Sequence, residues 1–220
     1  MPRHSSEKRT YLNISFGKIR EKVTKETPNA VSRENKNGDT VWEIVDKSVE
    51  GKITGINYKE HSEYGNSYEI TIEDGVETFN LSLHEDSKFA NGLLTRLPNV
   101  DLSKFVTIMP YEFTPSDSDK KRSGLNIYQG DQKIEPYFSA KVDGKWIYKE
   151  GFPEAPTGNV TKNQWKKYGL EVQEYLYEYF KKTLKPKFEM QEVVNHDHFE
   201  DNAKDPVKTE EDDDSSELPF

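Results

Sequence analysis

A basic triplet, Lys120, Lys121 and Arg122, is the densest positive cluster in the first 188 residues. It lies in the segment SDSDKKRSG, whose composition is typical of a loop. Lysine and arginine side chains in such a cluster can bind phosphate oxygens. By itself the triplet is more simply an ordinary solvated loop, so its chemistry depends on what lies beside it.

Aromatic faces would supply a second ingredient, because unpaired bases stack on them. Tyr64 is flanked by glycine and polar residues, which favours a loop tip. Tyr128 and Tyr137 fall out of phase with their apolar neighbours, which favours an outward orientation, whereas a tryptophan in a strand more often packs in the core or at its rim. The candidate nucleic-acid contacts are Trp42, Lys59, Tyr64, Lys120, Lys121, Arg122, Tyr128, Tyr137 and Trp146.

Motifs for enzymatic chemistry are missing from the sequence. It has no glycine-rich phosphate loop, no Gly-x-Ser-x-Gly elbow, no His-Glu-x-x-His motif and no cysteine. His196, His198 and Asp201 are spaced closely enough to bind a metal, but they lie in a polar, acidic stretch that is more simply a solvated linker. We therefore expect a protein that is not an enzyme and binds no metal or other cofactor.

Charge is unevenly distributed along the chain. The formal net charge is −9, but from Glu189 onward there are 12 acids and two bases, which leaves a net charge of +1 for residues 1–188. A polyanionic partner is therefore compatible with residues 1–188. The absence of cysteine, of a signal-like apolar stretch and of a long apolar segment predicts a cytoplasmic protein with no membrane partner.

The elements that would position these side chains follow a mainly β, α+β pattern. Apolar alternation predicts strands at 49–58, 68–72 and 79–83, with a bulge at Gly55 and a hairpin turn at Asp74-Gly75. A helical period follows from Phe89 to Leu97, and further strands are expected at 104–113 and 125–128. Three strands, a helix and two strands are the plan of an OB-fold, a five-stranded Greek-key barrel, although another small barrel or sandwich would fit the same pattern.

The remaining segments flank this predicted barrel. Residues 11–19 are expected to be one extended segment, followed by a polar linker over 24–39. A capping box at Thr161 and Gln164 begins a C-terminal helix that ends near Pro186. Its aromatic stripe packs on the body, or forms a surface for a partner helix or a homodimer. The expected organisation is an N-terminal arm (1–40), an OB-fold domain (41–139), a hairpin or loop with the C-terminal helix (140–188), and a disordered acidic tail (189–220).

The last residues of the chain combine acids with an apolar end. Asp212, Asp213 and Asp214 precede Leu218, Pro219 and Phe220, so that the terminal carboxylate is carried by a phenylalanine. The segment DDDSSELPF resembles the acidic tip of bacterial and bacteriophage single-stranded DNA-binding proteins. The size of the chain, its long N-terminal segment and its C-terminal helix depart from the common bacterial type and favour a divergent phage-encoded member, located in the bacterial host cytoplasm.

The resemblance implies that an OB-fold domain binds and protects single-stranded DNA without sequence specificity. It also implies that the tip residues Asp212, Asp213, Asp214, Leu218, Pro219 and Phe220 recruit proteins of replication, recombination and repair. The alternative function is a phage interaction or inhibitor protein, whose barrel binds protein and whose acidic tail mimics DNA or a host tail.

Overall fold

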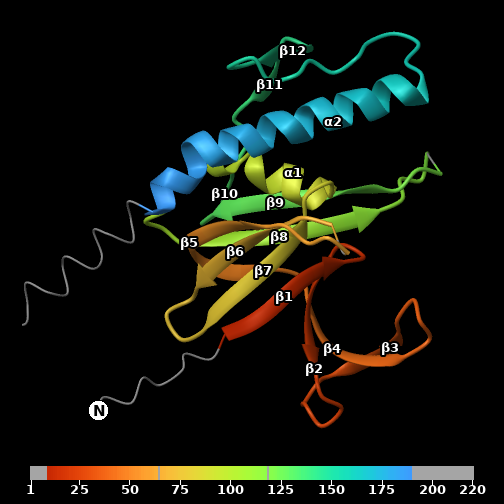
Figure 1. Ribbon diagram of the computed structural model, residues 1–220, viewed down its shortest axis with the longest axis vertical. Coiled ribbons are helices and arrows are strands. Elements are labelled where there is room, and N and C mark those ends of the chain that lie inside the picture. Colours follow the sequence, from red (N-terminus) through yellow and green to blue (C-terminus); the bar gives the residue numbers. More distant parts are fainter. Residues whose placement is uncertain (1–8, 64, 118, 190–220) are drawn as a thin grey trace, which may run out of the picture.

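The computed structural model describes residues 9–63, 65–117 and 119–189 (Figure 1). Its elements, in chain order, are β1 (Arg9–Ser15), β2 (Lys18–Val23), β3 (Val31–Glu34), β4 (Thr40–Asp46), β5 (Val49–Lys59), β6 (Ser67–Glu73), β7 (Thr78–His84), α1 (Lys88–Leu94), the 3-10 turn η1 (Leu97–Asn99), β8 (Val106–Phe113), β9 (Arg122–Gln129), β10 (Gln132–Lys133), β11 (Ser139–Val142), β12 (Lys145–Tyr148), α2 (Lys162–Tyr179) and the π-turn η2 (Phe180–Leu184). No helix in these ranges is both long enough and apolar enough to cross a membrane.

Ten strands form one mixed, open sheet in the order β10-β9-β8-β5-β6-β7-β1-β2-β4-β3. The predicted mainly β, α+β class is confirmed, as is the antiparallel β5-β6-β7 meander. The register between β5 and β6 shifts between Ile53 and Gly55, where the phase of the sequence slips. At the turn between β6 and β7, the Asp74 carboxylate accepts hydrogen bonds from the backbone N–H groups of Val76 and Glu77.

No closed barrel is present in the described residues, because β7 and β9 do not pair with each other. The free edge of β7 is taken by β1, which runs parallel to it, and the outer edge of β9 is taken by β10. The N-terminal residues therefore extend the sheet, where the sequence predicted a separate arm. The expected polar linker over 24–39 likewise contains β3, which pairs with β4.

The segment 11–19, predicted to be one extended piece, is a hairpin. Phe16 and Gly17 form a two-residue turn in which both φ angles are positive, 53° and 65°, and Ser15 pairs with Lys18 across it. Such angles are those of the hairpin turn that matches the natural twist of strands. The turn also lies against the edge of β8, because a Cβ built on Gly17 would be 2.3 Å from the backbone nitrogen of Glu112.

Gly17→Ala is expected to destabilise the fold by about 2 kcal/mol, since it adds an overlap with β8 to the cost of a left-handed alanine. Gly38→Ala is the matched control, because Gly38 has a φ of 85° but nothing within 4 Å of its Cβ position. Chemical denaturation of both variants separates the cost of the overlap with β8 from the cost of a left-handed alanine. Equal losses of unfolding free energy would show that the contact between the turn and β8 contributes nothing.

Two helices pack against the sheet. In α1, Ser87 caps the first turn and Gly92 lies close to Leu125 of β9. The predicted capping box of Thr161 and Gln164 begins α2. The second half of α2 and the turn η2 bury Val172, Leu176, Phe180 and Leu184 in the core.

Helical residues continue to Glu189, three residues past Pro186. The π-turn η2 just before this proline widens the helix, and the Lys185 N–H donates to the carbonyl of Phe180. A wider turn is one way for a helix to accommodate a residue that has no N–H of its own.

Candidate nucleic-acid interface

The outward face of β8 carries a series of exposed apolar side chains. Val106, Ile108 and Pro110 are buried, so the alternate residues point away from the core. Tyr111 is 36% exposed and Phe113 is 51% exposed. Their ring centroids are 6.0 Å apart at an interplanar angle of 41°. Two neighbouring rings on a sheet surface are a platform on which two bases can stack.

Strand β9 adds residues to the same face. In the antiparallel pair, Tyr128 lies opposite Thr107 and Arg122 opposite Phe113. Directly opposite residues share one face of a sheet, so Tyr128 and Arg122 are on the side of Tyr111 and Phe113. We refer to Tyr111, Phe113 and Tyr128 as the aromatic row.

Gly124 positions the first ring of this row. It lies opposite Tyr111 in the β8-β9 ladder, and a Cβ on Gly124 would be 2.6 Å from the Tyr111 hydroxyl oxygen. Only a residue without a side chain leaves room for the tyrosine to lie over β9. The pairing of a large residue with a glycine therefore fixes the direction in which Tyr111 points.

The predicted basic triplet lies where the β8-β9 loop enters β9. Lys121 makes an ion pair of 2.9 Å with Glu112, and Lys120 also interacts with another residue. Arg122 is exposed and makes no ion pair with any residue of the described ranges. The side chain best placed to bind a phosphate beside the aromatic row is therefore Arg122.

The β1-β2 turn brings a further aromatic residue and a further cation to β8. Phe16 is 62% exposed, and its neighbour Gly17 lies against the backbone of Tyr111 and Glu112. The guanidinium carbon of Arg20 is 5.4 Å from the centroid of the Phe16 ring. In Figure 1 the β8-β9 loop and the β2-β3-β4 segment project to the same side of the molecule.

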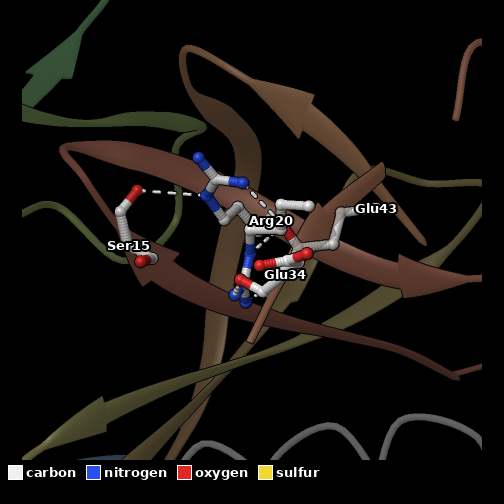
Figure 2. A network of polar contacts seen from close by, with 5 residues as sticks. Ser15, Arg20, Glu34 and Glu43 are labelled. Carbon is white, nitrogen blue, oxygen red and sulfur yellow. Dashed lines mark hydrogen bonds and ion pairs between the residues drawn. The ribbon is translucent and has the colours of Figure 1, made fainter. Parts of the chain in front are cut away.

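Arg20 belongs to a network centred on a buried carboxylate (Figure 2). Glu43, whose side chain is only 4% exposed, accepts from Arg20 at 2.5 Å and from Arg33 at 2.7 and 2.9 Å. Arg20 also donates to the Ser15 carbonyl, which ties the network to the β1-β2 turn. The hydrogen bonds from Arg33 are the largest cause that lowers the pKa of the Glu43 carboxyl, and the same pair raises the pKa of Arg33.

Arg20 of this network lies on a basic face of strand β2. Ile19 of β2 is buried, so Lys18, Arg20 and Lys22 lie on the opposite face of that strand. Because Glu43 is shared between two arginines, this part of the surface keeps an excess of positive charge. The basic face of β2 begins next to Phe16, at the turn that contacts β8.

Four other residues that were predicted to bind nucleic acid lie elsewhere in the fold, and none of the described interactions joins them to the aromatic row. Trp42 is half-buried in β4 with the Lys25 ammonium 6.0 Å from its ring centroid, and Lys59 is paired with Glu69. Tyr137 packs edge-on against Phe138, lies under Lys149 and donates its hydroxyl to Glu150, which raises its pKa. Trp146 is exposed on the β11-β12 hairpin. Tyr64 and the tip residues 212–214 and 218–220 lie outside the described residues.

Three aromatic residues of this surface, Phe16, Tyr111 and Phe113, were not among the predicted contacts. The phase of β8 contained the signal, since Val106, Ile108 and Pro110 occupy every second position and leave Tyr111 and Phe113 on the other face. Phe16 could not be found in this way, because its place depends on a turn that the alternation does not show.

A pocket of about 350 Å³ elsewhere on the sheet has the wrong charge for a nucleic acid. Its apolar wall includes Ile19, Phe79 and Phe105, and its acids are Glu21, Asp46, Glu50 and Asp74. Four carboxylates would repel phosphates. The described ranges contain no group of acids or histidines suited to a metal ion, and His196, His198 and Asp201, whose sequence context disfavours a role as ligands, lie outside them.

Comparison of the chain with protein-family models, with curated proteins and with solved structures found no match. The resemblance of the C-terminal segment to single-stranded DNA-binding proteins therefore rests on that segment alone. Any functional conclusion about the folded part must come from the aromatic row and the cations around it.

Proposed function

We propose that this protein binds single-stranded DNA without sequence preference through the outer face of β8 and β9. The observation that carries this proposal is the exposed pair of rings, Tyr111 and Phe113, on one sheet face beside the exposed Arg122. Every base has a π-face, so stacking on such rings tolerates all sequences.

The same surface favours single strands over duplexes. Bases in a duplex are already stacked on each other, so their faces are not available to aromatic rings on a protein surface. Arg122 supplies positive charge for phosphates beside the rings, and the basic face of β2 supplies more from the turn that contacts β8. The acidic tip then serves to recruit replication, recombination and repair proteins, as the resemblance implies.

We infer further that β5 to β9 with α1 form an OB-type unit. Its support is the order of three meander strands, a helix and two strands, with β8 paired to the first strand of the meander. In a complete OB barrel, the strands equivalent to β7 and β9 pair with each other and close the barrel. Here the β1-β2 hairpin occupies the place between these two strands. Its turn, which contacts β8, thereby becomes part of the binding surface.

Salt dependence of binding tests the role of the basic triplet. Changing Lys120, Lys121 and Arg122 to glutamine is expected to weaken binding of poly(dT) and to make the slope of log K against log salt shallower by at least about 0.7, the value for the one phosphate contact assigned to Arg122. Titration of full-length protein with a labelled oligonucleotide at several salt concentrations measures both.

A control with the same change in net charge replaces Lys181, Lys182 and Lys185, on the C-terminal helix, with glutamine. The slope should then stay as in the unchanged protein. If the slope of log K against log salt becomes shallower by the same amount in both triple variants, binding depends only on the overall charge of the protein. That result would refute a defined phosphate site at the β8-β9 loop.

A further inference from the structure

The pocket that is too acidic for a nucleic acid combines an apolar wall with a rim of carboxylates. Its volume of about 350 Å³ is near the lower end of the range for ligand pockets. The apolar residues are Leu12, Ile19, Val49, Phe79 and Phe105, the acids are Glu21, Asp46, Glu50 and Asp74, and none of the described lysines and arginines lines it. Such a lining suits a cation that carries an apolar stem.

The strands place two of these acids beside the apolar wall. Glu21 of β2 lies opposite Leu12 of β1, and Asp46 of β4 lies opposite Ile19 of β2. Directly opposite residues share one face of a sheet, so all four side chains are on the same side. This side is opposite to the basic face of β2, because side chains alternate along the strand. A ligand in the pocket therefore leaves the basic face open.

No other described residue neutralises the acids of the pocket. Within the ranges that the structure describes, Glu21, Asp46 and Glu50 form no ion pair and no side-chain hydrogen bond. Asp74 accepts hydrogen bonds from two backbone N–H groups and pairs with no described cation. A cleft lined by charges of one sign concentrates ions of the opposite sign. The four carboxylates therefore all favour a bound cation.

Two phenylalanine rings favour arginine as this cation. Phe105 is 43% exposed and Phe79 is half-buried, and both line the pocket. A guanidinium group is planar and weakly hydrated, stacks on aromatic faces, and pairs with a carboxylate through two parallel hydrogen bonds. The ammonium group of lysine is a compact, strongly hydrated charge and gains less from such a lining.

The flanking segments of the chain itself match this pocket poorly. Residues 189–220 carry a net charge of −10 and are repelled by its acids. Residues 1–8 precede β1, but they contain two bases, Arg3 and Lys8, and one acid, Glu7, which gives a net charge of only +1 against four carboxylates. A basic segment of another protein can bring several cations at once, so charge complementarity favours that occupant.

We propose that this pocket binds an arginine side chain from a basic segment of a partner protein. The stem of the arginine lies against Leu12 and Ile19, and its guanidinium stacks on Phe105 and pairs with Asp46. Further basic residues of the segment pair with the remaining acids. The site goes beyond the proposed function, because it is separate from the acidic tip and does not depend on DNA binding.

A methyl NMR titration of the full-length protein tests the proposal with the peptide acetyl-GRGRG-amide. Saturable shifts are expected for the methyl groups of Leu12, Ile19 and Val49, which line the pocket. These signals are local, so binding of the peptide to acids elsewhere in the chain does not imitate them. The matched peptide acetyl-GKGKG-amide should bind at least about threefold more weakly, because lysine has no flat, bidentate guanidinium.

Three results of the titration would overturn the proposal. The first is the absence of saturable shifts at these methyl groups, and the second is equal affinity for the lysine peptide. The third is a set of shifts that is seen only after residues 2–8 are removed, because the N-terminal segment of the chain would then be the occupant.

Two double variants with the same change in net charge show whether the pocket acids act. Glu21→Gln combined with Asp46→Asn should weaken binding of the arginine peptide at least about tenfold, because charged hydrogen bonds are lost. Glu154→Gln combined with Glu174→Gln, which alters two exposed acids outside the pocket, should leave the affinity unchanged. The methyl spectrum of each variant reports whether it is folded.

Equal losses in both double variants would show that the peptide responds only to overall charge, which would overturn the proposal. Sedimentation of the same variants tests a second copy of the chain as the occupant, and a change of oligomeric state in the pocket variant alone would overturn it too. Since no DNA is present in these measurements, the failure of this proposal and the failure of the proposed function are distinguishable.

Discussion

The double variant Tyr111→Ala, Phe113→Ala is expected to bind single-stranded DNA at least about 30-fold more weakly than the unchanged protein. Each base stacked on an aromatic side chain contributes about 1–3 kcal/mol, so losing two stacks costs about 2 kcal/mol or more. Both rings are on the outer face of β8, away from the core, so the variant should remain folded. Fluorescence anisotropy with a labelled poly(dT) oligonucleotide measures the change.

Trp165→Ala is the matched control, because Trp165 is an equally exposed aromatic residue on α2. Its DNA affinity should equal that of the unchanged protein. A loss with Trp165→Ala and none with the double variant would move the DNA site from the sheet to the helix.

Glu43→Gln is expected to lower the free energy of unfolding by about 3 kcal/mol. The substitution keeps the size of the side chain but leaves Arg20 and Arg33 facing each other without the buried carboxylate that both contact. At this chain length such a loss lowers Tm by about 6–12 °C. Thermal and chemical denaturation at neutral pH measure it. Glu34→Gln, which alters an exposed acid next to Arg33, should change the stability by less than about 0.5 kcal/mol.

The effect of Glu43 should also depend on pH. Its arginine partners lower the pKa of its carboxyl in the folded protein. The stabilisation is therefore complete above the ordinary glutamate pKa of about 4.3 and is lost as the pH falls through the lower folded value. The stability difference between the unchanged protein and Glu43→Gln should shrink in acid. A difference that stays constant from neutral pH to below pH 4 would contradict the role of the charged carboxylate.

The sequence was informative where the alternation of side chains reports burial directly. The strands β5 to β9, the bulge before Gly55, and the outward orientation of Tyr128 all follow from a period of two along the chain. The capping box at Thr161 fixed the start of α2 because the motif is local. Such features depend on neighbours a few residues away.

The N-terminal strands could not be derived in the same way. Whether the edge of β7 pairs with β9 or with β1 depends on a contact between residues more than 60 positions apart, such as Leu12 and Leu81. The turn at Phe16 and Gly17 interrupts what appears in the sequence as one extended segment. As a result, Phe16 and Arg20 escaped prediction, although the turn that carries Phe16 lies against the backbone of β8.

The most direct test of the central claim is equilibrium binding of the full-length protein to a single-stranded oligonucleotide and to its duplex at moderate salt. The aromatic row predicts tight binding to the single strand, similar affinity for different single-strand sequences, and much weaker binding to the duplex. Absence of single-strand binding, or equal affinity for the duplex, would contradict the account and leave the β8-β9 face as a surface for another partner.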